Sequence, residues 1–245
     1  NGTIDMYVND IGVGYACSIN GSDINMHVLH LNGTFETLLV ESLVSGSADD
    51  CAIGLTSQDR IQIAYNVGPD LRLARLALKN AVYSGLTWHL RTIAEDVFSS
   101  GLTLTFDSES KTHLMFQDTD LALHHLWFNK AFWNHTILDN GPIGSDIEVE
   151  IDSTDTFHVA YTNSAEGELR LINFNETIEV RRVLSRGSTI TQAIGMDLDS
   201  NDIEQITYSK SDGNGNNTIS LLRSLAGKDT GRIDPEPSLI INYDE

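Results

Sequence analysis

Apolar and polar residues alternate in short stretches that recur along the whole chain. Residues 102–118 contain two such stretches, LTLTF and THLMF, joined by a polar turn. Alternation with a period of two is typical of a β-strand that buries one face. The pattern therefore predicts a chain of short strands connected by turns.

The stretches share one register when Asp107 is taken as the reference position. Residues one, three and five places before each reference position are apolar in all six copies. A fixed period of roughly this length indicates structural repeats. The reference positions are Asn9, Thr56, Asp107, Asp152, Asp199 and Asp244, separated by 47, 51, 45, 47 and 45 residues.

Each of the first five copies continues with three more apolar runs. The second run carries an aromatic residue nine places after the reference position in four copies, at Tyr65, Phe116, Tyr161 and Tyr208, and we expect these rings to pack in the core. Repeated four-stranded antiparallel units predict an all-β fold, a β-propeller, because a β-sandwich has no reason to repeat its register. We predict a single domain, 1–245, with five four-stranded antiparallel blades at 4–43, 51–97, 102–142, 147–187 and 194–234.

A surplus first strand is predicted at residues 239–244, with no partner strands after it. Three interpretations stay open. The chain is a piece of a longer array or larger ring, or it is a five-bladed ring in which one terminal strand replaces the other, or the surplus strand pairs with a neighbouring subunit.

The segments FDSESKTHLMF and IDSTDTFHVAY carry a strand–Asp-Ser–turn–strand signature. In this respect the chain resembles tandem-repeat β-propeller proteins, and the resemblance covers nearly all of its residues. It implies the fold and no particular activity.

The chain is strongly acidic, with 35 Asp and Glu against 15 Lys and Arg and a formal net charge of −20. Nucleic acid or an anionic membrane surface would repel it, so we expect neither as a partner. No apolar run reaches the ~18 residues of a membrane span. The acidity fits a secreted protein, one that takes up divalent cations, or simply a soluble one.

Cys17 and Cys51 fall on adjacent predicted blades, where they form one disulfide or remain two small buried residues. Six Asn-x-Ser/Thr triplets are candidate glycosylation sites, several of them in predicted turns. Together they favour an extracellular or cell-surface location. The triplets begin at Asn1, Asn20, Asn32, Asn134, Asn175 and Asn216.

Four carboxylates lie off the apolar face of the predicted first strands, at Asp5, Glu148, Glu150 and Asp197. Carboxylates on inner strands are the groups that a glycosidase-like site would use as acid and base or nucleophile. The chain has 35 Asp and Glu residues, so some of them would fall at such positions by chance, and this is the competing explanation.

Calcium is the candidate cofactor, and no other is indicated. Asp212, Asn214 and Asn216 alternate like donors in a calcium loop, although the closing Glu is absent. The Asp of each Asp-Ser turn is a second candidate, and ordinary capping of the turn by that side chain is the alternative.

Histidines recur at one register point, six places after the reference position, at His113 and His158, where other copies have Gln62 and Gln205. A residue type repeated at one register point indicates a hydrogen-bonding role within the blade.

Trp127 and Trp133 lie near an irregular segment and are the candidates for stacking with a sugar.

The leading functional hypothesis is a non-enzymatic, secreted or cell-surface interaction or assembly module, with a protein or glycan partner and self-association through the terminal strand. The first alternative is a carbohydrate-binding lectin. The second is a carbohydrate-active hydrolase or lyase that uses rim carboxylates.

Overall fold

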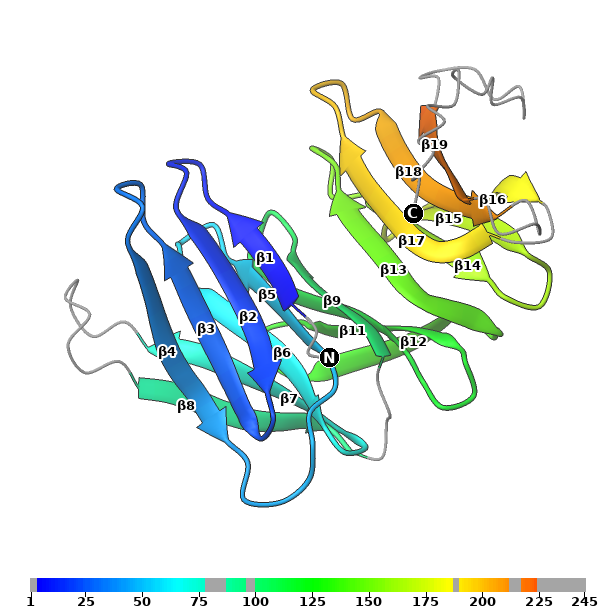
Figure 1. Ribbon diagram of the computed structural model, residues 1–245. Helices are drawn as coiled ribbons and strands as arrows, with labels where there is room; N and C mark the ends of the chain where they lie inside the picture. Colours follow the sequence, from blue (N-terminus) through cyan, green and yellow to red (C-terminus); the bar gives the residue numbers. More distant parts are fainter. Residues whose placement is uncertain (1–3, 78–86, 96–99, 187–189, 212–216, 224–245) are drawn as a thin grey trace. The chain divides into compact units, whose positions relative to one another are not determined.

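The computed structural model describes residues 4–77, 87–95, 100–186, 190–211 and 217–223, and its strands form five antiparallel sheets (Figure 1). The chain divides into two compact units, Asn1–Leu138 and Asp139–Glu245. Within the described ranges, no helix has the length and apolar character needed to cross a membrane.

Unit 1 contains three sheets, blades 1 to 3, in which consecutive strands pair with one another. Blade 1 comprises β1 (Ile4–Val8), β2 (Gly14–Asn20), β3 (Asp23–Leu29) and β4 (Phe35–Ser42); blade 2 comprises β5 (Cys51–Leu55), β6 (Ile61–Val67), β7 (Asp70–Ala77) and β8 (Thr87–Ala94); blade 3 comprises β9 (Ser100–Phe106), β10 (Thr112–Gln117), β11 (Leu123–Phe128) and β12 (Trp133–Asp139).

Unit 2 contains blades 4 and 5, and among the described residues blade 5 has three strands. The predicted fourth strand of blade 5 and the predicted surplus strand at 239–244 lie outside the described residues. Blade 4 comprises β13 (Ile143–Ile151), β14 (Phe157–Asn163), β15 (Glu168–Phe174) and β16 (Glu179–Arg186); blade 5 comprises β17 (Ile190–Leu198), β18 (Glu204–Ser211) and β19 (Asn217–Arg223).

The same turn follows the first strand of every blade. The reference residue exchanges two backbone hydrogen bonds with residues three and four places later, and the residue three places later has a positive φ, from 56° at Asp59 to 84° at Gly12. The reference side chain accepts a further hydrogen bond from the N–H four places later, which caps the turn. The capping pairs are Asn9–Val13, Thr56–Arg60, Asp107–Lys111, Asp152–Thr156 and Asp199–Ile203. The predicted register is confirmed.

Within each unit the core lies between consecutive blades. In unit 1 the inner face of blade 1 packs on Ile53 and Tyr65 of blade 2, and in unit 2 blade 4 packs on blade 5 in the same way. The four register aromatics are buried, which confirms the prediction that they pack in the core: Tyr65, Phe116, Tyr161 and Tyr208.

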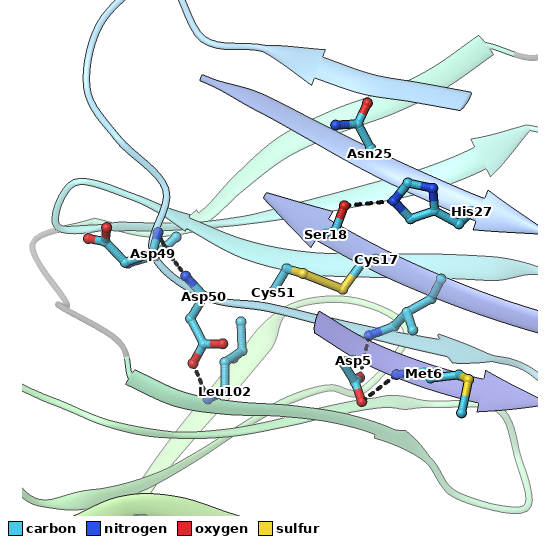
Figure 2. Close-up of a disulfide and its surroundings, with 12 residues drawn as sticks. Asp5, Met6, Cys17, Ser18, Asn25, His27, Asp49, Asp50, Cys51 and Leu102 are labelled. Atoms are coloured by element: carbon cyan, nitrogen blue, oxygen red, sulfur yellow. Dashed lines mark hydrogen bonds between the residues drawn. A yellow bond between two sulfur atoms is a disulfide. The ribbon is translucent and has the colours of Figure 1, made fainter. Parts of the chain in front are cut away.

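The predicted disulfide is present between Cys17 of β2 and Cys51 of β5, with a Cα–Cα distance of 6.4 Å (Figure 2). Beside it, two carboxylates join first strands of successive blades. Asp5 Oδ2 accepts a hydrogen bond from the N–H of Ile53, and Asp50 Oδ2 accepts one from the N–H of Leu102. Blades 1 and 2 are therefore linked by a disulfide and a partly buried hydrogen bond, and blades 2 and 3 by a buried hydrogen bond, in addition to apolar packing.

Candidate functional site

A cleft lies between blades 2 and 3 of unit 1. It consists of a larger cavity of about 500 Å³ and a smaller one of about 290 Å³. Arg75, His89 and Phe128 line both cavities. Ligand pockets typically have volumes of roughly 300–1,000 Å³, so the cleft has room for a small ligand.

The strand register brings polar side chains to this cleft. Gln62 of β6 lies opposite Arg75 of β7, and Arg75 lies opposite His89 of β8. Residues directly opposite one another in paired strands project from the same face of a sheet. This face is turned to blade 3, because Gln62 Oε1 accepts a hydrogen bond of 3.0 Å from Thr112 Oγ1 of β10. Blade 2 therefore presents a row of polar groups to its neighbour.

Arg75 is held between the two cavities by an aromatic ring. Its guanidinium carbon lies 5.4 Å from the centre of the Phe128 ring, a cation–π geometry. Its Nε atom is buried without a hydrogen-bond partner. Burial lowers the pKa of Arg75, and the positive charge of Arg91 lowers it further.

The cleft is rich in positive charge although the protein is acidic. Among the described residues that line the two cavities there is no Asp or Glu. Lys111 and Lys130 both lie near Glu109, at 3.4 and 2.9 Å, at the edge of the cleft. The arginines have no carboxylate partner in the described part of the chain. Five of the chain's 15 Lys and Arg line the cavities: Arg60, Arg75, Arg91, Lys111 and Lys130.

Trp133, a predicted sugar-stacking candidate, lines the smaller cavity, with its ring 5.4 Å from that of Phe128. Trp127, the other candidate, stacks on His125 with ring centres 4.7 Å apart and lines neither cavity. Phe132, in the same segment, is exposed and also lines neither cavity. The structure therefore places one of the two tryptophans in the cleft.

The candidate catalytic carboxylates are divided between the units. Asp5 lies on β1 in unit 1, and its two oxygens accept the N–H groups of Met6 and Ile53, both at 2.8 Å. Burial raises the pKa of Asp5, against the effect of these two hydrogen bonds. Its carboxylate thus has a structural role in joining β1 to β5.

Glu148, Glu150 and Asp197 lie on β13 and β17 in unit 2. Burial, followed by the charge of Asp197, raises the pKa of Glu150 to about 7. Two interacting carboxyl groups of this kind are compatible with acid–base chemistry. Catalysis by these residues stays a prediction.

The candidate calcium residues Asp212, Asn214 and Asn216 lie outside the described residues. In the Asp-Ser turns, the Oδ1 atoms of Asp107 and Asp152 accept backbone N–H groups. Those oxygens therefore cap their own turns. No group of three or more His, Cys, Asp or Glu in the described ranges is arranged to hold a metal ion.

Four of the six candidate glycosylation sites lie in the described ranges. Asn20 and Asn32 are exposed, at the end of β2 and in the turn before β4. Asn175 is partly buried, and its Nδ2 atom donates to Thr156 Oγ1. Asn134 has a buried Nδ2 atom, the atom to which a glycan would attach. Asn1 and Asn216 lie outside the described residues, and glycosylation at each of the six stays a prediction.

The sequence pattern does not single out Arg75, His89 or Arg91. The register gives little signal: the position of Arg75 is filled by Val28 in blade 1, Trp127 in blade 3, Asn173 in blade 4 and Arg223 in blade 5. A cation at this position is therefore not particular to blade 2. The significance of Arg75 depends on what the next blade places opposite it, which the repeat pattern alone does not give.

No protein-family model and no curated protein matches the sequence. Three solved structures show what its fold is similar to. An ulvan lyase of family PL25, bound to -[GlcA(1-4)Rha3S]-, has a TM-score of 0.68 at 11% identity, over 97% of this chain and 71% of the lyase. The SapL1 lectin, in complex with α-methyl fucoside, has a TM-score of 0.65 at 8% identity, over 98% and 80%.

The fungal lectin of Aleuria aurantia, described as a six-bladed β-propeller that recognises fucose, has a TM-score of 0.61 at 11% identity, over 97% of this chain and 78% of the lectin. At such identities the likeness establishes the fold alone. The chain has a β-propeller fold, as its repeats predict. The prediction that residues 1–245 form one domain stays a prediction.

Proposed function

We propose that this protein is a carbohydrate-binding β-propeller and that the cleft between blades 2 and 3 is its sugar site. The observation that carries the proposal is the composition of the cleft, whose two cavities are lined by Arg75, His89 and Gln62 together with the rings of Phe128 and Trp133. A sugar presents apolar C–H faces and polar hydroxyl groups. Aromatic rings pack against the former and hydrogen-bonding side chains bind the latter.

The comparisons support this proposal at the level of the fold. Two of the similar structures are lectins and one is a lyase with a bound saccharide, so this architecture accommodates sugar sites in other proteins. The leading hypothesis from the sequence was an interaction module with either a protein or a glycan as its partner. The cleft between blades 2 and 3 supports the glycan as the partner.

A glycan array followed by calorimetric titration of the best ligand tests the proposal. We expect Trp133→Ala and His89→Ala each to weaken binding by about tenfold or more, since each removes a group that lines the cleft. Phe132→Ala is the matched control, because Phe132 is an exposed aromatic residue of the same segment outside the cleft. Absence of binding to any glycan, or equal losses in the control, would contradict the proposal.

We also propose an extracellular or cell-surface location. The disulfide between Cys17 and Cys51 is of a kind that persists in oxidising compartments and is rare in reducing ones. The exposed triplets at Asn20 and Asn32 are accessible to glycosylation. Mass spectrometry of the protein purified from its native source would detect both features, and free thiols with bare asparagines would contradict this location.

One observation favours assembly as a second function. The face of blade 1 opposite blade 2 is apolar and exposed, whereas blade 2 buries its corresponding residues, such as Ile53, against blade 1. The blade-to-blade interface is thus repeated within unit 1 and continues onto a free face, for which we propose a blade of a second copy as the partner. The exposed residues are Ile4, Met6, Val8, Leu29, Phe35 and Leu39.

Sedimentation velocity tests this second proposal. We expect association that Met6→Lys and Phe35→Lys together abolish, and that Val44→Lys, at an exposed apolar residue outside this face, leaves unchanged. Removal of residues 238–245 tests whether the predicted terminal strand takes part. A monomer at all concentrations would contradict the assembly proposal.

A further inference from the structure

The interface between blades 4 and 5 is built on the same register as the cleft between blades 2 and 3. Arg182 of β16 lies opposite Leu171 of β15, as Arg91 of β8 lies opposite Leu73 of β7. The two arginines are therefore equivalent, and both belong to the outer strand of a blade that faces the next one.

Two other positions correspond in the same way. His158 lies opposite Asn173, as Gln62 lies opposite Arg75. On the next blade, Glu204 begins β18 five places after its reference residue, and Thr112 begins β10 at the same point. The essential difference is that blade 5 presents a carboxylate where blade 3 presents a short hydroxyl.

In unit 2 the carboxylate of Glu204 lies in the interface and contacts three polar neighbours. Glu204 Oε1 accepts a hydrogen bond from Arg182 at 2.7 Å and from Asn173 at 2.8 Å, and lies 2.9 Å from His158 Nδ1. The side chain of Glu204 is only 6% exposed. The protein thus supplies its own anion to this arginine.

In unit 1 no such anion is supplied. Thr112 extends only to Gln62, and the space beyond it is the cleft. Arg75 and Arg91 both line the smaller cavity and repel one another. Neither has a carboxylate partner among the described residues of a chain that carries 35 Asp and Glu. Two neighbouring guanidinium groups without a counter-charge favour an anion between them.

We infer that the cleft selects acidic saccharides, and that Arg75 and Arg91 bind the carboxylate of the sugar at the place that Glu204 fills in the other interface. This inference rests on the proposed carbohydrate-binding function. It adds the class of ligand, a uronic-acid-containing glycan, and the residues that distinguish it from a neutral one.

Matched glycan pairs that differ only in the carboxylate test the inference. Glucuronides are compared with glucosides, and galacturonides with galactosides, on an array and by calorimetry, with sodium sulfate as an anion without a sugar. We expect the acidic member of a pair to bind at least about tenfold more tightly, since charge-assisted bidentate hydrogen bonds are roughly twice as strong as neutral ones. The difference should shrink as salt rises.

Three variants locate the effect. Arg91→Gln, at an exposed position, should abolish the preference for the acidic sugar, so that the two members of a pair bind equally. Thr112→Glu should block the acidic sugar by placing a carboxylate where blade 5 has Glu204, and its melting temperature shows whether it folds. Arg181→Gln removes an exposed arginine of an outer strand and should change nothing.

The outcomes separate the inference from the proposed function. Equal affinity for the two members of every pair would overturn the inference and leave sugar binding in place. Binding of sulfate as tight as that of any acidic sugar would overturn sugar binding while supporting an anion site. Absence of binding to both sugars and sulfate would overturn both.

Discussion

An ion pair between Arg182 and Glu204 fills the interface between blades 4 and 5, which we call the closed interface. The interface between blades 2 and 3 contains a cleft instead, and we call it the open interface. Both are built on the same strand register, and both have an arginine on the outer strand. In the first, Glu204 neutralises Arg182 and accepts a further hydrogen bond from Asn173. In the second, Thr112 leaves Arg75 and Arg91 beside a cavity. The two interfaces differ at this register point, Glu204 against Thr112, and also at the positions of His158 against Gln62 and Asn173 against Arg75.

The largest effect is expected when the closed interface is broken. Glu204→Ala leaves Arg182, Asn173 and His158 without their shared acceptor, and removing one partner of a buried ion pair costs about 3–5 kcal/mol. Urea denaturation measures this loss as a lower midpoint. Glu204→Gln, which keeps an acceptor oxygen, should cost less, and equal losses in the two variants would show that charge is unimportant there.

The interface between blades 1 and 2 is held in a third way, by the disulfide. Replacing Cys17 and Cys51 together by Ala opens a loop closed over a sequence separation of 34 residues and should cost about 2–4 kcal/mol. The cost should appear in denaturation of the oxidised protein and disappear when both proteins are compared under reducing conditions. A cost that persists under reduction would point to lost packing instead.

The two units should respond to pH in different ranges. Burial raises the pKa of Asp50, which joins blade 2 to blade 3, to about 6 from 3.8. Because the folded pKa is higher, this group stabilises the fold below pH 3.8, and the contribution is lost as pH rises through 6. Asp50→Asn should therefore stabilise the protein by about 3 kcal/mol at pH 7 and by nothing at pH 3.5.

His158 titrates in a higher range. Burial alone lowers its pKa, but the hydrogen bonds to Glu204 and Asp152 outweigh burial and leave the pKa raised above 6.5. Its stabilising effect is complete below pH 6.5 and is lost as pH rises through the folded pKa. Urea denaturation of His158→Gln from pH 5 to 9 should show the largest loss at pH 5. A loss independent of pH would contradict this assignment.

The smallest loss of stability is expected at the open interface, where Thr112 makes a single hydrogen bond across the two blades. Thr112→Val removes one hydrogen bond to Gln62 and should cost about 1 kcal/mol. Denaturation measures the cost, and binding of the sugar identified by the array should persist. A loss as large as that of Glu204→Ala would mean that the two interfaces are equally dependent on this position.

Much of the fold follows from the sequence. The capped turn needs a short polar side chain at the reference position and a residue tolerant of positive φ three places later, and these local requirements mark Asp107 and Asp152 without any tertiary contact. The alternating apolar residues give the strands, and the aromatic ring nine places on gives the core. The sequence placed Cys17 and Cys51 on adjacent blades, where a disulfide was one of two possibilities. The structure shows that the disulfide forms.

Only part of the candidate site could be predicted from the sequence. Trp133 was found because it lies in an irregular segment, whereas Arg75 and Arg91 lie within regular strands and resemble ordinary solvated residues in the sequence. The position of Asp5 on an inner strand suggested chemistry, yet its oxygens bind backbone N–H groups.

The repeat, its register and the direction of each side chain follow from the sequence alone, because strand periodicity and turn capping are local properties. Tertiary structure decided which side chains meet across two blades. The character of an interface depends on contacts such as those of Arg182 with Glu204 and of Thr112 with Gln62, whose members lie more than 20 residues apart. Only packing brings them together, and only packing leaves Arg91 without a counter-charge among the described residues.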